Sequence, residues 1–333
     1  MKKYNVAIVG IRGAVGYCMY QVLKERKFPI NELRPMSSNP DECPSYEING
    51  RKVKAVKLSH DAFKGIDFAL FSPGAALSLE YAPSAVKAGA IVIDNTSAFR
   101  MDPTVPLVVP EVNPQDIEKH KGLIANPNCS TIQMVVALKP LHDYARIKRI
   151  VVSTYQSVSG AGSEAIEELE KQVINRQTPP KAFPHPIAFN LIPQIDVAMD
   201  NFYTKEEMKM VNETKKIMGD DSIRVTATCV RVPVLWAHSE SINIETEKKL
   251  TREKAIELLS KAPGVHIIDD LRHSKYPQPL DVAGQDDTFV GRIREDESIK
   301  NGLNLWVVAD NLRKGAATNA IQIAEEIIKK HQQ

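Results

Sequence analysis

Cysteine, charge of one sign and long apolar runs are all scarce in this sequence, and each shortage narrows what the protein can be. Its four cysteines, Cys18, Cys43, Cys129 and Cys229, show no CxxC spacing, so neither a zinc site nor a disulfide framework is indicated. The formal net charge is +2 with both signs intermingled, which gives no footprint for nucleic acid or a membrane surface. We therefore expect no metal, no nucleic-acid partner and a reducing, cytoplasmic location.

No apolar run is long enough to cross a membrane. The opening stretch, MKKYNVAIVG, carries two lysines, but its apolar part is only a few residues long. We expect neither a signal peptide nor a membrane span. With 333 residues, of which 43% are hydrophobic and 25% charged, the composition predicts a soluble globular protein of two domains.

The N-terminal part contains a dinucleotide-binding signature. Residues 4–9 (YNVAIV) are an apolar, β-branched run that predicts a buried parallel strand. GIRGAVG follows at residues 10–16, and then a helical pattern, YCMYQVLKER. Glycines allow a tight turn there, and the N-terminus of a helix offers backbone N–H groups to a pyrophosphate. The spacing is GxxGxxG rather than GxGxxG, so a βα turn without a ligand stays the alternative.

Further strands and helices alternate as in a Rossmann-type doubly wound sheet of an α/β protein. DFALFSPG (67–74), AIVIDNTSAFR (90–100) and GLIANPNC (122–129) predict strands, and SLEYAPSAVKAG predicts a helix. Ligands bind at the carboxyl edge of such sheets. We expect that edge to collect Ser72, Asn95, Arg100 and Cys129.

Residues 131–315 predict a second domain of the α+β class. Residues 147–162, 223–234, 239–247 and 304–310 are strand-like, and the last three have the alternation typical of an antiparallel sheet. The final stretch, GAATNAIQIAEEIIKKH, predicts an amphipathic helix with Ala317, Ile321, Ala324 and Ile328 on one face.

Cys129 lies in NPNCSTIQM, between a turn and an apolar helical run. Ser130 and Gln133 fit a capping box that would begin the helix beside the cysteine. A helix N-terminus lowers the pKa of a thiol, so Cys129 is a candidate nucleophile. Small apolar cysteines are common in protein cores, and that interpretation is kept for the other three.

A thiolate also needs an acid/base group and a substrate anchor, and RVPVLWAHSE offers Arg231 and His238. The residues between them look like a strand, whose odd separation would put the two side chains on opposite faces. A bend at Pro233, or the end of the strand, would let both reach one pocket.

Taken together, the motifs closely resemble those of aspartate-β-semialdehyde dehydrogenases. The resemblance runs nearly end to end, through GxxGAVG, DNTSAFRMD, VPEVN, NPNCSTIQM, STYQSVSGAG, FNLIPQID, EEMKMVNETKKIM, RVPVLWAHSES, TFVGRIR and DNLRKGAATNAIQIAE. It implies a glyceraldehyde-3-phosphate-dehydrogenase-like architecture, in which residues 1–130 bind NADP and a C-terminal helix at 316–333 completes that domain. Residues 131–315 would form the catalytic and dimerisation domain, in a homodimer or a homotetramer.

The resemblance also implies a reaction and the residues that carry it. L-Aspartate 4-semialdehyde, phosphate and NADP⁺ would give L-4-aspartyl phosphate and NADPH, reversibly, on the route to lysine, threonine, methionine and diaminopimelate. Cys129 would form a thioester, Asn128 would stabilise the oxyanion, Gln156 would orient the thioacyl group and His238 would act as acid/base. The residues implied in substrate and phosphate binding are Arg231, Glu206, Arg100, Lys209 and Asn95.

The implied cofactor site departs from the family pattern at several points. Ile11 and Arg12 replace the Ala and Thr of the usual GATGAVG, Asn39 stands where the family has an Arg for the 2′-phosphate, and Pro73 replaces a small residue. Arg12 could supply a replacement charge, and Asp41 and Glu42 lie a few residues late for an NAD-type carboxylate, so NADP is predicted while relaxed NAD use stays open. The implied cofactor residues are Gly10, Arg12, Gly13, Ala14, Val15, Gly16, Ser37, Ser38, Asn39, Ser72, Ser159, Gly160, Gly162 and Asn319.

Three other classes share part of this pattern. N-Acetyl-γ-glutamyl-phosphate reductases use the same thioester logic, but their substrate has an acylated amine and would not need Glu206. Glyceraldehyde-3-phosphate dehydrogenases place the nucleophile in a different local motif. Non-catalytic nucleotide-binding relatives typically lack the cysteine, whereas Cys129, Gln156, Arg231 and His238 are all present here.

Overall fold

The chain forms two compact units in this computed structural model, which describes residues 2–330. Unit 1 comprises Met1–Pro127 and Ala316–Gln333, and unit 2 comprises Asn128–Gly315. Residues 331–333 of the predicted C-terminal helix lie outside the described residues. No helix in the described part of the chain is both long and apolar enough to span a membrane.

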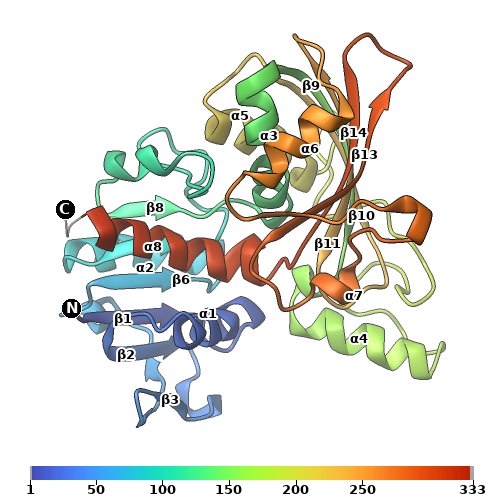
Figure 1. Ribbon diagram of the computed structural model, residues 1–333. Helices are drawn as coiled ribbons and strands as arrows, with labels where there is room; N and C mark the ends of the chain where they lie inside the picture. Colours follow the sequence, from blue (N-terminus) through green and yellow to red (C-terminus); the bar gives the residue numbers. More distant parts are fainter. Residues whose placement is uncertain (1, 331–333) are drawn as a thin grey trace. The chain divides into compact units, whose positions relative to one another are not determined.

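Unit 1 is built on a six-stranded parallel sheet with the order β5-β2-β1-β6-β7-β8 (Figure 1). Helices α1 (Ala14–Glu25) and α2 (Ala75–Lys87) connect β1 to β2 and β6 to β7. The strand order runs one way from β1 and the other way from β6, which confirms the predicted doubly wound sheet. Its strands are β1 (Tyr4–Val9), β2 (Ile30–Ser37), β5 (Val56–Lys57), β6 (Phe68–Phe71), β7 (Ile91–Asp94) and β8 (Leu123–Ala125). A hairpin of β3 (Tyr46–Ile48) and β4 (Arg51–Val53) follows β2.

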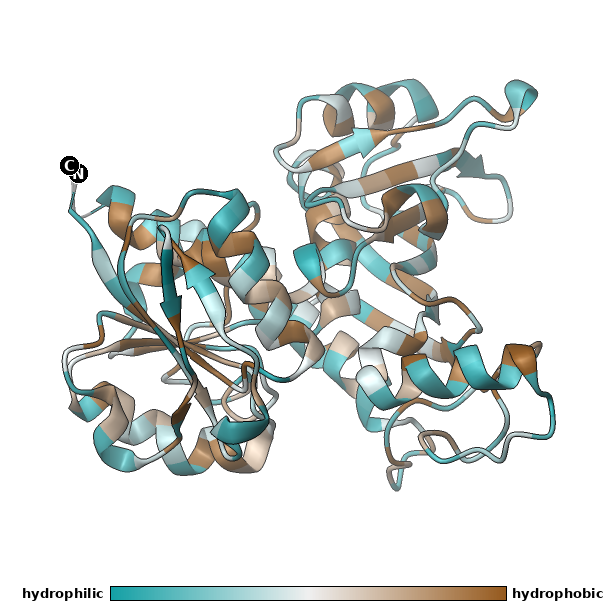
Figure 2. Ribbon diagram, turned by 90° about the horizontal axis from the view of Figure 1, so that it is seen from below, coloured by the Kyte–Doolittle hydropathy of each residue, from teal (hydrophilic) through white to brown (hydrophobic). Residues whose placement is uncertain are grey.

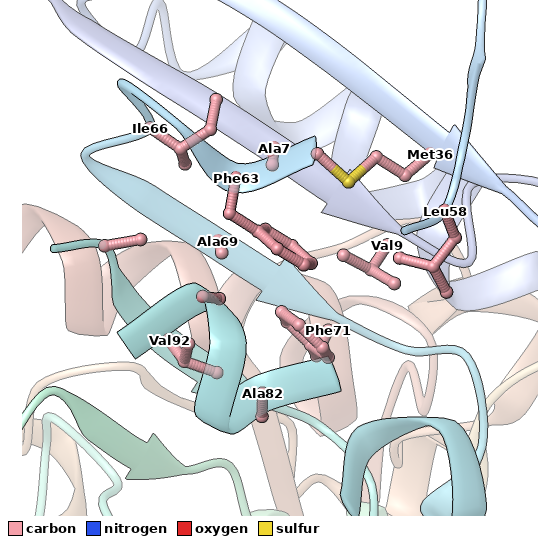
Figure 3. Packing of buried hydrophobic residues seen from close by; sticks show 12 residues of the cluster. Ala7, Val9, Met36, Leu58, Phe63, Ile66, Ala69, Phe71, Ala82 and Val92 are labelled. Atoms are coloured by element: carbon pink, nitrogen blue, oxygen red, sulfur yellow. The ribbon is translucent and has the colours of Figure 1, made fainter. Parts of the chain in front are cut away.

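An apolar core holds the sheet of unit 1 against the elements around it. Phe63 and Phe71 stack with ring centroids 5.8 Å apart, and Val9, Met36 and Val92 pack around them (Figure 3). Each such side chain contributes roughly 1.5–3 kcal/mol when fully buried. In Figure 2 the strands of this unit are brown where they cross its middle. The short apolar runs of the sequence are therefore the buried strands.

The last helix returns the chain to unit 1. A π-helical turn at Arg313–Ala317 leads into α8 (Thr318–Lys330), which packs against α1 and β7 (Figure 1). Ala317, Ile321, Ala324 and Ile328 are all buried, which confirms the predicted apolar face.

Unit 2 contains a mixed six-stranded sheet with the order β10-β9-β11-β14-β13-β12. Helix α3 (Cys129–Ala145) crosses one face between α5 (Lys205–Met218) and α6 (Arg252–Ser260) (Figure 1). Its strands are β9 (Ile147–Gln156), β10 (Arg224–Arg231), β11 (His238–Thr246), β12 (Val265–Ile267), β13 (Thr288–Asp296) and β14 (Gly302–Ala309). Helices α4 (Ser163–Ile174) and α7 (Pro279–Val282) complete the unit.

One strand of unit 2 runs the opposite way to the prediction. Strand β11 is antiparallel to β9 and β14, but β10 is parallel to β9, with Arg224 beside Arg149 and Arg231 beside Gln156. The antiparallel expectation for residues 223–234 was wrong. The long crossover through α4 and α5 between β9 and β10 brings the chain back in the same direction, as parallel strands require. Residue alternation within β10 carries no information about that crossover.

Candidate active site

Cys129 is the first residue of α3, and Asn128 caps the helix. The Asn128 Oδ1 accepts from the backbone N–H groups of Ser130 and Thr131 at 3.1 and 3.2 Å. The predicted capping box was wrong, because Asn128 occupies the N-cap position and Ser130 and Gln133 lie inside the helix, both buried. The half-buried Cys129 thiol thus lies at the positive end of a long helix, where a thiolate is stabilised.

Gly315 packs directly against Cys129, where there is no room for a side chain at position 315. A Cβ built on Gly315 would lie 2.8 Å from the Cys129 Cβ and 3.3 Å from its Cα, closer than real side chains approach. Gly315 lies in the motif DNLRKGAATNAIQIAE, but no role was predicted for it. Its signal in the sequence is a glycine at the start of an otherwise helical stretch, which is unusual unless a close neighbour requires it.

The Glu206 carboxylate accepts hydrogen bonds from three of the predicted site residues. Its Oε1 accepts from Asn128 Nδ2 at 2.8 Å and from Gln156 Nε2 at 3.3 Å, and its Oε2 accepts from Lys209 Nζ at 2.9 Å. Burial opposes ionisation of Glu206, but Lys209 and the two amides outweigh it and hold the carboxyl pKa below its usual value. Glu206 is therefore a buried carboxylate that faces the turn carrying Cys129.

Lys209 and the backbone of Asn128 are held by further carboxylates. The Lys209 Nζ also donates to Asp196 Oδ2 at 2.8 Å, so its ammonium lies between two acids. Burial lowers the pKa of Lys209, but Glu206 and Asp196 outweigh that effect and raise it. The Asn128 N–H donates to Glu213 Oε2 at 2.7 Å, a contact that the sequence analysis did not foresee.

The side chains of Arg231 and His238 both lie close to Gly160. The residues between them do not form the expected strand: β10 ends at Arg231, β11 begins at His238, and Ala237 has a φ of 68°. A Cβ on Gly160 would lie 3.0 Å from Arg231 Nη1 and 3.2 Å from His238 Nε2. The end of the strand thus removes the geometric obstacle, and both side chains lie against the SGAG loop.

Arg231 lies within reach of several site groups. Its buried guanidinium donates from Nη1 to the Ser157 carbonyl at 2.7 Å. Burial lowers the Arg231 pKa, while Glu206 and Cys129 oppose that shift. Glu206 and Cys129 are therefore close enough to Arg231 for their charges to act on its guanidinium.

His238 is a neutral ring in this environment. It is fully buried, and burial together with the Arg231 charge lowers its pKa well below the usual histidine value. Its Nδ1 accepts from the Ser157 N–H at 3.0 Å.

A cavity of about 330 Å³ lies in unit 1 where the strand order reverses. Gly10 ends β1 there with a φ of 85°, and a Cβ on it would lie 2.7 Å from the Ser72 carbonyl oxygen. Gly13 caps α1, whose first turn contains Ala14, Val15 and Gly16. The lining residues are Gly10, Arg12, Gly13, Ser37, Ser38, Leu58, Ser72, Pro73 and Leu77. This is the place in a doubly wound sheet where a dinucleotide is bound.

The rim of this cavity carries an ion pair that the sequence analysis missed. Arg12 Nη1 lies 2.5 Å from Glu42 Oε2. A short 3₁₀ turn at Pro40–Glu42 brings Glu42 back towards the loop, although it is several residues beyond β2. Asn39 does not line the cavity, and its backbone N–H donates to Ser37 Oγ at 3.1 Å.

Asn95, Arg100 and Asn319 meet at Asn126 within unit 1. Arg100 donates from Nε to the Asn126 carbonyl at 2.9 Å and from Nη2 to the Asn95 carbonyl at 2.8 Å. The Asn126 Nδ2 donates to Asn95 Oδ1, and its Oδ1 accepts from Asn319 Nδ2, both at 2.7 Å. Asn126 was not selected from the sequence, although it lies in the NPNC motif itself.

The remaining predicted cofactor residues, Ser159, Gly160 and Gly162, lie in unit 2 on and beside a 3₁₀ turn at Val158–Ala161. Among the described residues, no cluster of three or more His, Cys, Asp or Glu side chains is placed to hold a metal ion.

The chain matches known proteins along nearly its whole length. Residues 5–120 match the semialdehyde dehydrogenase, NAD binding domain, and residues 138–314 match the semialdehyde dehydrogenase, dimerisation domain. An aspartate-semialdehyde dehydrogenase of Aquifex aeolicus is 56% identical over 98% of both chains, and one of Bacillus subtilis is 50% identical over 98% of this chain and 97% of its own. The crystal structure of aspartate semialdehyde dehydrogenase II of Vibrio cholerae complexed with ASA, 49% identical, covers 99% of both chains with a TM-score of 0.96.

Proposed function

The chain belongs to the aspartate-semialdehyde dehydrogenase family of oxidoreductases, and on that premise we propose that it reduces L-4-aspartyl phosphate to L-aspartate 4-semialdehyde with NADPH. The observation that carries the proposal is the group of buried side chains beside Cys129, namely Glu206, Gln156 and Asn128. The charge of Glu206 also acts on the nearby guanidinium of Arg231. The reaction is reversible, and its place is cytoplasmic biosynthesis of lysine, threonine, methionine and diaminopimelate.

Cys129 is the nucleophile in this mechanism. Its thiolate attacks the acyl carbon of aspartyl phosphate, a C–S bond forms, and phosphate leaves with the electron pair of the broken C–O bond. When bound, the nicotinamide supplies the hydride that reduces the resulting thioester. The C–S bond then breaks, the semialdehyde is released and the thiolate returns.

Charged residues of both signs anchor the substrate. Arg231 holds the α-carboxylate, for which a guanidinium offers two parallel N–H donors, and Glu206 holds the α-ammonium. Burial of the Arg231 guanidinium supports its assignment, because a buried charge needs an opposite charge or several hydrogen bonds. The position of Glu206 beside Asn128 and Gln156 supports the assignment of its carboxylate. Lys209, Arg100 and Asn95 bind the phosphate group.

Amides and a histidine act on the reacting group. Gln156 orients the thioacyl group, and Asn128 stabilises the oxyanion. The Asn128 N–H and one Nδ2 hydrogen already bond to Glu213 and Glu206, so this contribution must use the second Nδ2 hydrogen. His238 is the acid/base group.

The residues of unit 1 fit a nicotinamide dinucleotide. Gly10 lies too close to Ser72 to carry a side chain, and its bare backbone lets the loop approach a pyrophosphate. The first turn of α1 offers backbone N–H groups to the same phosphates. Arg12 with Ser37 and Ser38 would bind the 2′-phosphate of NADP, in place of the arginine that Asn39 replaces. We also assign Ser159, Gly160, Gly162 and Asn319 to cofactor binding.

We propose that the chain forms a homodimer through unit 2, whose family match is a dimerisation domain. Ile192 pairs with Arg231 at the end of β10, and the segment 189–202 that contains it exposes Phe189, Leu191 and Phe202. Large exposed apolar side chains of this kind favour a protein contact. Light scattering of the purified protein and of Phe202→Glu tests this: a dimer or tetramer that falls to a monomer supports it, and a monomeric wild type contradicts it.

Reduction of nicotinamide cofactor in the reverse direction tests the function. We expect NADPH to form from aspartate semialdehyde only when phosphate is present, faster with NADP⁺ than with NAD⁺. A preference for N-acetylglutamate semialdehyde would indicate the reductase that acts on the acylated amine. Folded protein without turnover of either aldehyde would instead indicate a non-catalytic nucleotide-binding protein.

A further inference from the structure

Asp196 ends the motif FNLIPQID, and a turn of the backbone brings its carboxylate to α5. Its φ of 69° lies in the left-handed region, which Asp adopts more readily than most residues. The Val197 N–H donates to Asp196 Oδ1 at 2.8 Å, and the Lys205 N–H donates to the Val197 carbonyl at 2.9 Å. The first turn of α5 is thus tied to this segment, and the other carboxylate oxygen of Asp196 faces Lys209.

The Lys209 ammonium is shared by two carboxylates. Its Nζ lies 2.8 Å from Asp196 Oδ2 and 2.9 Å from Glu206 Oε2. Burial raises the pKa of Asp196, but the hydrogen bonds from Lys209 and from the Val197 N–H outweigh that effect and lower it. The pKa of Glu206 is lowered as well. One ammonium therefore faces two ionised acids, and the three side chains together carry one excess negative charge.

Glu206 has room for a further hydrogen bond on one oxygen only. Its Oε1 already accepts from Asn128 Nδ2 and Gln156 Nε2, whereas its Oε2 accepts from Lys209 Nζ. A carboxylate oxygen has two lone pairs, so Oε1 is saturated and Oε2 has one position left. An ammonium group of a substrate that binds to Glu206 must then lie beside the ammonium of Lys209.

Two ammonium groups on one carboxylate oxygen repel each other. If Glu206 were the only acid, Lys209 would neutralise it and the substrate would gain little from binding there. Asp196 gives Lys209 a carboxylate of its own, so that two positive charges face two negative charges once the substrate is bound. The balance matters because the side chains of Glu206 and Lys209 are only 7% and 20% exposed, and water screens them weakly.

We propose that Asp196 determines substrate specificity through Lys209: it neutralises the Lys209 ammonium, so that the charge of Glu206 stays available to the α-ammonium group of the substrate. The inference rests on the proposed function and deepens it, since it explains how one site holds a substrate ammonium beside a lysine that binds phosphate. Asp196 itself touches neither substrate. Its attraction for Lys209 also weakens the hold of that lysine on phosphate, so the two substrates respond to Asp196 in opposite ways.

Asp196→Asn removes the charge and keeps the size, the hydrogen-bonding oxygen and the tolerance for a left-handed backbone. We expect the KM for aspartate semialdehyde to rise about two- to fivefold and the KM for phosphate to fall by a similar factor, the range of a partly exposed ion pair, with kcat nearly unchanged. The inhibition constant of succinate semialdehyde, which lacks the ammonium group, should stay the same. Asp200→Asn, which removes an exposed acid from the same segment, is the matched control and should change neither KM.

The same substitution in a Lys209→Gln background tests whether Asp196 acts through the lysine. Without a competing ammonium at Glu206, Asp196→Asn should change the KM for aspartate semialdehyde by less than about twofold. An equal effect in both backgrounds would overturn the proposed route. Asp196→Ser removes the same charge and gives the same test if Asp196→Asn does not fold.

The direction of the two shifts decides the proposal. An unchanged KM for aspartate semialdehyde in Asp196→Asn, or two KM values that move in the same direction, would overturn the role of Asp196 and leave the proposed function standing. Wild-type protein without phosphate-dependent turnover would contradict the proposed function itself, and this inference with it. The wild-type assay therefore separates the two failures before any variant is compared.

Discussion

Gly315 lies directly against Cys129, since a Cβ at position 315 would be 2.8 Å from the Cβ of the cysteine. The nucleophile is therefore positioned from two sides: Asn128 caps its helix, and the bare backbone of Gly315 leaves room for its side chain. Any added atom at Gly315 must displace Cys129 or the turn that carries Gly315.

Gly315→Ala is expected to misplace Cys129 without unfolding the protein. A shift of the order of 1 Å in a reacting group costs up to about 100-fold in rate, so we expect kcat to fall by about 10- to 100-fold. Steady-state kinetics and the thermal midpoint measure the two effects. A variant with wild-type kcat, or one whose loss of activity follows only from unfolding, would contradict this explanation of the glycine.

Gly160→Ala is expected to disturb Arg231 and His238 together. The new methyl group would lie 3.0 Å from Arg231 Nη1 and 3.2 Å from His238 Nε2, so one of the two side chains must move. We expect a higher KM for aspartate semialdehyde and a lower kcat, each by about tenfold, because the substrate anchor and the acid/base group are both affected. Ala161→Ser, one residue further in the same turn, is the control. Equal kinetics for the two variants would show that the glycine has no special role.

Glu42→Gln is expected to favour NADP. The Glu42 carboxylate forms an ion pair with the Arg12 guanidinium. It therefore competes with the 2′-phosphate of NADP for that guanidinium. Removing an exposed competitor of this kind changes affinity only modestly, by about two- to fivefold. We expect NADPH to bind more tightly by that factor and NADH to bind as before, measured by the quenching of protein fluorescence.

Asp41→Asn removes the same charge one residue earlier and is the matched control for Glu42→Gln. If both variants strengthen NADPH binding equally, the effect is a general change in charge and not a release of Arg12. If Arg12→Gln leaves the NADPH affinity unchanged, the role of Arg12 at the 2′-phosphate is wrong.

Glu206→Gln is expected to destabilise the protein in a pH-dependent way. The folded-state pKa of Glu206 lies below the ordinary carboxyl value of 4.5, so its stabilising contribution is present above that value and is lost as the pH falls through the lowered pKa. At neutral pH we expect Glu206→Gln to lower the free energy of unfolding by about 1.5–3 kcal/mol, the usual contribution of hydrogen bonds to a charged group. Urea unfolding at neutral and acidic pH should show this difference shrink as the pH falls, and a difference that grows would have the wrong sign.

Much of this fold could be predicted because apolar runs and glycines report on local structure. The run 4–9 with Gly10 specified β1 and its turn, and the spacing of Ala317, Ile321 and Ile328 specified the buried face of α8. The direction of β10 could not be predicted, because it depends on the crossover from β9 through α4 and α5 and not on the residues of β10.

The candidate site shows the same division. Cys129, Arg231 and His238 were selected from local motifs, but the capping of α3 by Asn128 was missed because serine and glutamine fitted a familiar pattern. Glu213 was missed because its contact with Asn128 joins parts of the chain 85 residues apart. Contacts of that kind follow from tertiary packing, which residue spacing does not report.

Mass spectrometry of the acyl-enzyme tests the central claim most directly. Wild-type protein mixed with aspartate semialdehyde and NADP⁺, without phosphate, should accumulate a covalent adduct on the peptide that contains Cys129, and adding phosphate should release it. Cys129→Ala should form no adduct, while Cys229→Ala, which removes a buried thiol whose pKa burial raises, should behave like the wild type. An adduct on another residue, or phosphate-dependent NADPH formation by Cys129→Ala, would contradict the account.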